Sequence, residues 1–193
     1  MRQPGKAIYC SSELTSGRRW YDALRQHGAK SNSALKEKLG EADYQLCYQR
    51  NMDANKGWAE RFAAIVRHGQ NDGTDVINPG PLSVPGWGQD EYNALWEQLI
   101  RTRVREVRFN RNWQFSNGCT FEFAVAFDAG IPRLDSQGEE LDPYAAVALV
   151  GKAVAGFEKE GFDVEKLQRN LERLKSLLNF PPPDQATSCI DAR

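Results

Sequence analysis

The alternation of short apolar runs with longer helical stretches is the feature that most constrains this chain. The short runs are residues 6–12, 75–78, 104–109 and 130–134, and stretches of helical period separate them. Such alternation indicates parallel strands in one sheet, because each parallel pair needs a long crossover, usually a helix. The sequence therefore predicts an α/β protein with a Rossmann-like or flavodoxin-like parallel sheet flanked by helices.

The helices are predicted from apolar spacing and from residues that favour helix starts. Ser16, Asp142 and Asp163 are expected caps, with Pro143 in the first turn after Asp142. Residues 29–44 have only a weak helical period, and residues 44–48 are ambiguous between strand and helix. The last two helices are additions beyond the strand–helix units. The predicted helices span residues 16–27, 55–68, 90–101, 119–129, 142–161 and 163–178.

The length of the chain suits a single domain. The chain has 193 residues, and a domain of this size buries a sizeable core with little left for a second one. We expect one domain over residues 1–179. The segment 180–193 begins Phe-Pro-Pro-Pro and is otherwise polar, so we expect a disordered tail there.

Charge and composition narrow the classes of partner. The chain has 25 Lys and Arg against 26 Asp and Glu, so no global field favours a nucleic acid polymer or a membrane surface. No apolar run approaches the roughly 20 residues of a membrane span, and no secretory signal is visible, which favours the cytoplasm. The four Cys and two His lack the spacing of a metal site. We expect a small-molecule partner and neither metal nor cofactor.

Glu122 is the candidate reactive group. It is the only ionisable residue in two turns of an otherwise apolar helix, and an isolated buried carboxylate is costly. Helical spacing puts Val125, Ala126 and Ala129 on its side, where the alanines leave room for a pocket. The competing interpretation is that an acid in a helix's first turn is favoured by the macrodipole, by about 0.3–1 kcal/mol.

The residues just before this helix suit an anion. Ser116, Asn117 and Gly118 offer a hydroxyl, an amide and a backbone without a Cβ. They precede a helix N-terminus, where unpaired N–H groups favour negative charge. This pattern is typical of a phosphate cradle.

The same segment resembles a known signature. Trp113-Gln-Phe-Ser-Asn-Gly-Cys-Thr-Phe-Glu122, followed by Gly130-Ile-Pro132, is similar to the S-x-G-x-x-x-E motif of the nucleoside 2-deoxyribosyltransferase superfamily. Ile8-Tyr-Cys-Ser-Ser12 and Val76-Ile-Asn-Pro79 resemble the ends of that superfamily's first two strands. Together these pieces cover roughly half of the chain, discontinuously.

The resemblance implies an activity and a set of roles. Glu122 would act at C1′ of a nucleoside or nucleotide, oriented by a hydrogen bond from Tyr9, and the base would leave. A Ser at position 116, where other members have Asp, is similar to the nucleoside 5′-monophosphate N-glycosidases. The resemblance also implies a homodimer or larger assembly. The expected substrate-binding residues are Ser116, Asn117, Gly118, Trp113, Ser12, Asn78, Trp87 and Asp90, with either tryptophan stacking on the base and Asp90 or Glu91 as acid.

Two departures keep other interpretations open. The superfamily commonly has an Asp at its third strand, where this chain reads Arg103-Val-Arg-Glu-Val-Arg108, and the stretch between Gly28 and His68 is longer than usual. A nucleotide-binding sensor without activity is therefore one alternative, and an NAD glycohydrolase is another. The identity of the base, ribose against deoxyribose, and hydrolysis against transfer stay open.

Overall fold

The sheet of the computed structural model contains four parallel strands in the order β2-β1-β3-β4, which confirms the predicted α/β class. The structure describes residues 6–70 and 73–179, so the predicted disordered tail lies outside it. The strands are β1 (Ala7–Ser11), β2 (Val76–Ile77), β3 (Val104–Phe109) and β4 (Arg133–Leu134).

The central strand β1 is buried on both faces. Ile8 and Cys10 pack with Phe62 and Val66 of helix α2 (Asn32–His68), whereas Tyr9 belongs to the larger core on the other face. That core includes residues of α3 (Gln89–Arg103) and α4 (Asn117–Asp128). The alternation follows from the two-residue period of a strand.

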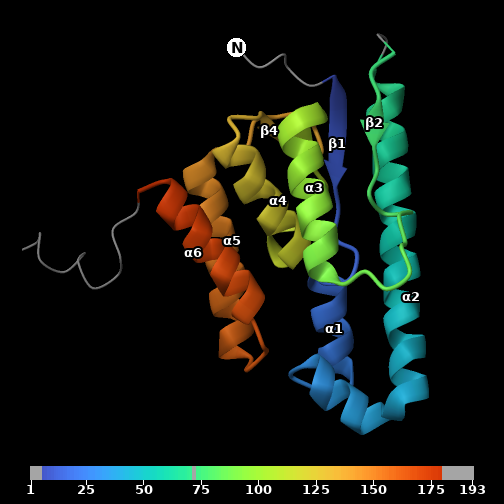
Figure 1. The fold of residues 1–193 in the computed structure, drawn as a ribbon. Helices are drawn as coiled ribbons and strands as arrows, with labels where there is room; N and C mark the ends of the chain where they lie inside the picture. The colour runs from blue at the N-terminus through green and yellow to red at the C-terminus, as the bar shows by residue number, and fades with distance from the viewer. Residues whose placement is uncertain (1–5, 71–72, 180–193) are drawn as a thin grey trace, which may run out of the picture.

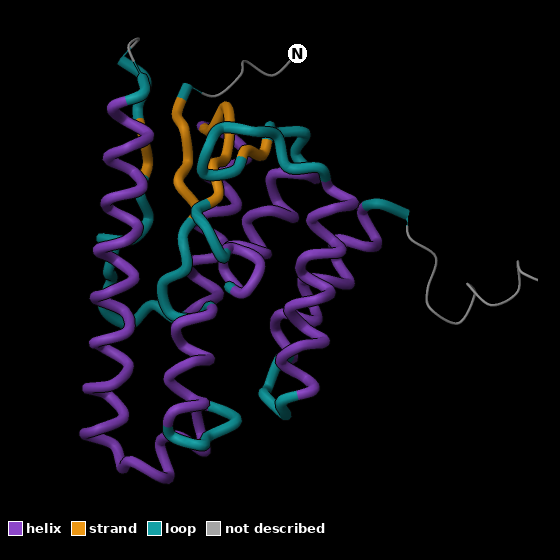
Figure 2. The backbone as a smooth tube through the Cα atoms, turned by 180° about the vertical axis from the view of Figure 1, so that it is seen from behind, coloured by secondary structure: helices purple, strands orange, loops and turns teal. Residues whose placement is uncertain are grey.

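The strand order creates a crevice at one end of the sheet. From β1 the chain moves to β2 on one side and then returns across β1 to β3 on the other. Parallel sheets bind ligands outside the carboxyl ends of the strands where the direction reverses, here between β1 and β3. Figures 1 and 2 show the strands at one end of the molecule, with helices extending past their carboxyl ends.

Residues 32–48, most of the segment without a clear helical period, are helical. They form the first part of α2, which runs from Asn32 to His68 and is broken at Gly40, where φ is 76°. Ser31 accepts a hydrogen bond from the backbone N–H of Ala34 and so caps this helix. The apolar spacing that predicted a helix over residues 55–68 includes Trp58 and Ile65, but both side chains are exposed.

The first helix begins differently from the prediction. Helix α1 (Arg18–Gln26) has Gly17, which has no side chain, at its N-cap. Ser16, the predicted cap, instead accepts a hydrogen bond from the backbone N–H of Asn117 at 3.0 Å. Its hydroxyl therefore joins the loop after β1 to the start of α4.

The two additional C-terminal helices form a layer beyond α4. Helix α5 (Pro143–Lys159) is capped by Asp142, as predicted, whereas α6 (Glu165–Leu177) follows Val164 and not the predicted cap Asp163. Leu167, Leu171 and Leu174 of α6 are buried in the main core. Figure 1 shows α5 and α6 on the far side of α4 from β1 and α2.

Both edge strands are short, with two residues each in β2 and β4. Beyond β4 the chain folds back, with Leu134 in an antiparallel bridge to Glu140 and the Leu141 N–H donating to the Arg133 carbonyl. Among the helices in residues 6–70 and 73–179, none has the combined length and apolarity of a membrane span.

Candidate active site

Glu122 is buried beneath the crevice and held by two hydroxyl groups of β1. Its side chain is 6% exposed. The Tyr9 hydroxyl donates to Oε1 at 2.6 Å, and the Ser11 hydroxyl donates to Oε2 at 2.5 Å. The predicted hydrogen bond from Tyr9 is thus present. Because each carboxylate oxygen has two lone pairs, each keeps one for a ligand.

Burial sets the protonation of this group. Loss of solvation raises the pKa of Glu122 to about 7, while the hydrogen bonds from Ser11 and Tyr9 act in the opposite direction. Burial and the neighbouring Glu122 carboxylate raise the pKa of Tyr9 well above its ordinary value. Tyr9 therefore stays protonated near neutral pH and remains a donor. Glu122 exchanges between its two protonation states in the same range.

A cavity of about 150 Å³ opens in front of Glu122. This is roughly ten times the space that one water molecule needs. Its walls come from the loops after β1, β2 and β3 and from helices α2, α3 and α4. Within the lining, Glu122 and Lys56 are the charged residues. The cavity thus lies at the carboxyl ends of the strands, where the strand order places a ligand site.

Several predicted site residues meet at this cavity. Ser12, Ser116 and Gly118 line it together with Glu122, although they come from segments about a hundred positions apart. Gly118 lies one turn before Glu122 on α4, so the two share a face. Ser116 is the N-cap of this helix and accepts a hydrogen bond from the Cys119 N–H at 3.4 Å.

Other predicted site residues are placed elsewhere. Trp113 is 5% exposed and stacks on Phe123 within the core, with ring centroids 4.8 Å apart. It is not among the residues that line the cavity, and neither are Trp87 and Asn117. A base in this cavity would not meet the Trp113 ring.

Asn78 and the two expected acids also lie outside the lining. Asn78 Nδ2 donates to Glu60, and Asn78 Oδ1 accepts from the Gly80 N–H. Both side-chain groups therefore hold the loop after β2. Asp90 is exposed in the first turn of α3, and Glu91 accepts from the Gly88 N–H. Glu91 is therefore the cap of α3 and not an acid over the site.

The environment of Glu122 on its helix differs from the prediction in two ways. Val125 and Ala126 are fully buried and do not line the cavity, which opens instead towards Gly118. Helix α4 begins at Asn117, so Glu122 lies in the second turn. The macrodipole effect falls off within the first turn, and it therefore does not explain this carboxylate.

The sequence reasoning missed several residues. Ser11 was not assigned, although it lies two residues after Tyr9 on β1 and side chains at that spacing share a face. Its position was therefore a usable signal. Lys56, Tyr92 and Trp96 line the cavity from α2 and α3, and Trp96 meets the Tyr9 ring edge-on at 5.9 Å. No local pattern marks these three, because their approach depends on tertiary packing.

Within the part of the chain that the structure describes, no group of three or more His, Cys, Asp or Glu side chains is arranged to hold a metal ion. Cys119 borders the site, but burial and the Glu122 carboxylate raise its pKa above the ordinary thiol value. It is therefore a poor nucleophile. No protein-family model matches this chain, and neither a curated protein nor a solved structure shows significant similarity to it.

Proposed function

We propose that this protein cleaves the N-glycosidic bond of a nucleoside or a nucleoside 5′-monophosphate, with Glu122 as the reactive carboxylate. The observation that carries the proposal is the single buried carboxyl, held by Tyr9 and Ser11 at the wall of a cavity at the strand ends. A group fixed at both oxygens needs little reorganisation to meet a substrate carbon. The resemblance of the segment from Trp113 to Glu122 supports the same chemistry.

In the proposed reaction the Glu122 carboxylate is first the nucleophile and then the leaving group. A Glu122 oxygen bonds to C1′ while the bond from C1′ to the base nitrogen breaks, and the base leaves with that electron pair and takes up a proton. Water, or a second base, then attacks C1′ and releases Glu122. Hydrolysis and transfer differ in this acceptor. With its pKa near 7, Glu122 is substantially ionised at neutral pH, as a nucleophile must be.

The polar groups beside Glu122 suit the sugar and its substituents. Ser12, Ser16 and Ser116 bring hydroxyl groups to the lining, and Lys56 brings a cation. A phosphate at the sugar's 5′ position would be favoured by Lys56 and by the N-terminus of α4. These groups favour a nucleotide over a free nucleoside.

The main experiment is a screen for release of free base. Nucleosides, nucleoside 5′-monophosphates and NAD are incubated with the protein, and the products are separated by chromatography. Glu122→Gln should lower turnover on the order of a thousandfold or more, since the nucleophile is removed. Glu158→Gln, an exposed carboxyl on α5, is the matched control and should leave turnover unchanged. Undiminished turnover by Glu122→Gln would refute the proposal.

A second candidate is a nucleotide-binding sensor that catalyses no reaction. It is favoured by the cavity lining, in which Glu122 has no second carboxyl beside it. Thermal unfolding separates the two functions, because a ligand that binds the folded state raises the melting temperature. A nucleotide that stabilises the protein without releasing base would support the sensor, and base release would exclude it.

Assembly and location belong to the same proposal. The superfamily resemblance implies a homodimer or larger assembly, while the balanced charge and the lack of a visible secretory signal favour a small-molecule substrate in the cytoplasm. Sedimentation of the purified full chain measures the assembly directly, and a monomer at micromolar concentration would contradict it.

A further inference from the structure

A second cavity, of about 550 Å³, lies on the other side of the loop that follows β1. It shares no lining residue with the cavity at Glu122. Its polar walls come from that loop, from α1 and α2, and from the turn after β3. The residues that matter below are Glu13, Arg18, Arg19, Arg50, Asn51 and Asn112.

Asn51 lines this cavity with an unsatisfied amide. Its side chain is 6% exposed, and both Oδ1 and Nδ2 are buried without a hydrogen-bond partner among the described residues. A buried polar group left unpaired lowers the stability of the folded state. Buried polar atoms in native proteins are nearly always paired, so this amide indicates a partner from outside the chain. That partner must accept from Nδ2 and donate to Oδ1.

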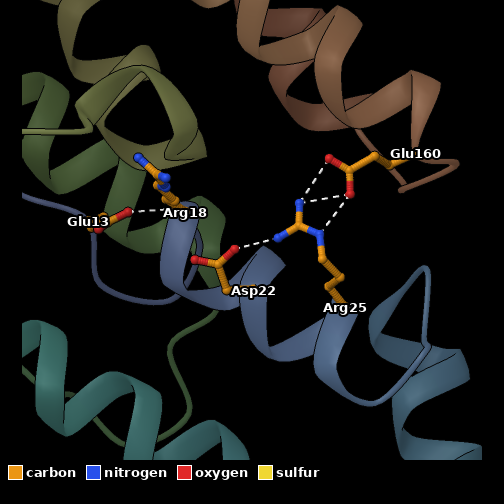
Figure 3. Close-up of polar contacts among 5 residues, drawn as sticks. All are labelled: Glu13, Arg18, Asp22, Arg25 and Glu160. Atoms are coloured by element: carbon orange, nitrogen blue, oxygen red, sulfur yellow. Dashed lines mark hydrogen bonds and ion pairs between the residues drawn. The ribbon is translucent and has the colours of Figure 1, made fainter.

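The charges around Asn51 favour an anion. The guanidinium groups of Arg18, Arg19 and Arg50 make no ion pair or side-chain hydrogen bond within residues 6–70 and 73–179. Arg25, on the same helix as Arg18, is by contrast paired with Asp22 and with Glu160 (Figure 3). Asp22, which also lines this cavity, is thus already engaged by Arg25.

The remaining acid of the cavity does not neutralise it. Glu13 accepts a hydrogen bond from the Arg18 backbone N–H at 2.9 Å, as Figure 3 shows. Burial raises the pKa of Glu13 to about 7, against the lowering effects of that hydrogen bond and of Arg19 and Arg18. Near neutral pH the cavity therefore carries more positive than negative charge.

We propose that this second cavity binds a hydroxyl-bearing phosphate monoester, with the phosphate on Arg18, Arg19 and Arg50 and the hydroxyl on Asn51. Guanidinium groups bind phosphate oxygens in pairs, which suits three arginines without other partners. Asn51 Nδ2 donates to a phosphate or hydroxyl oxygen, and Oδ1 accepts from the hydroxyl. A ligand with both groups, such as a sugar or polyol phosphate, satisfies every unpaired atom described above.

The test is calorimetric titration of the full chain with glycerol 3-phosphate at constant ionic strength. This probe has a phosphate and hydroxyls but no base, so it separates the second cavity from the proposed nucleotide site. Saturable binding with one site per chain is expected. Inorganic phosphate should bind about tenfold more weakly, because it cannot serve both atoms of Asn51 as well. Equal affinity for the two probes would refute the contact between Asn51 and the hydroxyl.

Substitutions assign the binding to this cavity. Arg50→Gln should weaken binding about tenfold or more, and so should Asn51→Asp, which keeps the shape but adds a negative charge. Arg61→Gln removes the same charge from α2 at a residue that packs on Trp58 and should leave the affinity unchanged. Arg50 is exposed, so its variant is expected to fold even if Asn51→Asp does not, and circular dichroism checks both. Unaltered affinity in Arg50→Gln, or no saturable heat at millimolar probe, would overturn the proposal.

Discussion

Glu122 and Glu13 are two carboxyl groups with the same pKa, about 7, on opposite sides of one loop, but Glu122 is buried and Glu13 is only half-buried. Loss of solvation is the largest cause for both. They differ in what holds them. Glu122 receives two side-chain hydroxyls from β1, whereas Glu13 receives one backbone N–H and has arginines nearby.

This difference shows that the pKa alone does not identify a reactive group. Glu122 faces a cavity in which it is the single acid, and both of its oxygens are oriented. Glu13 lies in a cavity with unpaired cations, where its negative charge would compete with an anionic ligand. These surroundings are the reason why we propose chemistry for Glu122 and an adjustment of the cavity's charge for Glu13.

The comparison of Glu122 with Glu13 can be tested by the pH dependence of the free energy of unfolding, which has the largest expected effect. The folded pKa of Glu122, about 7, lies above its ordinary value of 4.5. Between these values the unfolded chain loses a proton that the folded chain keeps, so the free energy of unfolding should fall as pH rises and level off above pH 7. Glu122 alone contributes a loss of about 3 kcal/mol, and Glu13, whose pKa is also about 7, adds to it in the same direction. Urea unfolding from pH 4 to 8 measures it.

The two variants Glu122→Gln and Glu13→Gln divide this slope between the carboxyls. Each should remove the part that its own carboxyl contributes, but the first should also abolish base release. A slope that is undiminished in both variants would show that neither group has a raised pKa.

Gly17→Ala comes next, with an expected loss of about 2 kcal/mol. Gly17 has a φ of 121°, and a Cβ there would lie 1.8 Å from Glu13 Oε2 and 2.8 Å from Glu13 Cβ. The substitution therefore has to displace the Glu13 side chain. Gly156→Ala, in α5 with open space around it, is the control and should be neutral or stabilising. Chemical denaturation compares them, and equal effects would mean that Glu13 is not held against Gly17.

Tyr9→Phe tests the hydroxyls that set Glu122 apart. Loss of this donor to a charged group should cost about 1–2 kcal/mol at pH 8. Because the Tyr9 hydrogen bond lowers the pKa of Glu122, the variant should reach full activity at higher pH. The profile of kcat/KM against pH detects the shift, and Tyr44→Phe on α2 is the control. A fall in activity that is equal at every pH would assign Tyr9 a structural role.

Ser16→Ala has the smallest expected effect, about 1 kcal/mol. Its hydroxyl accepts from the Asn117 N–H and thereby ties the loop between the two carboxyls to α4. Base release should fall because the loop also lines the cavity, while glycerol 3-phosphate binding at the second cavity should be retained. If the variant lost glycerol 3-phosphate binding and kept base release, Ser16 would instead belong to the second cavity.

The four strands and the unusual position of Glu122 were within reach of the sequence because their signals are local. The apolar runs predicted all four strands, and Glu122 was conspicuous in its apolar helix. Trp113 was misplaced because an aromatic residue beside a motif looks the same whether it faces a ligand or Phe123.

The second cavity had no such signal. Glu13, Arg50 and Asn51 come together when α2 folds back past the loop after β1, and their spacing in the sequence carries no pattern. An unpaired amide is likewise a property of three-dimensional packing. Ser16 shows the same limit, because the residue that donates to its hydroxyl, Asn117, is about a hundred positions away in the sequence.

The short outer strands have a consequence for how the protein behaves in a crowded cell. A long bare sheet edge invites another chain to pair with it and seeds aggregation. Here β2 has two residues, and β4 is followed by a segment that turns back to bond with it. The sheet edges therefore offer few unpaired backbone groups to which a strand of another copy could bond.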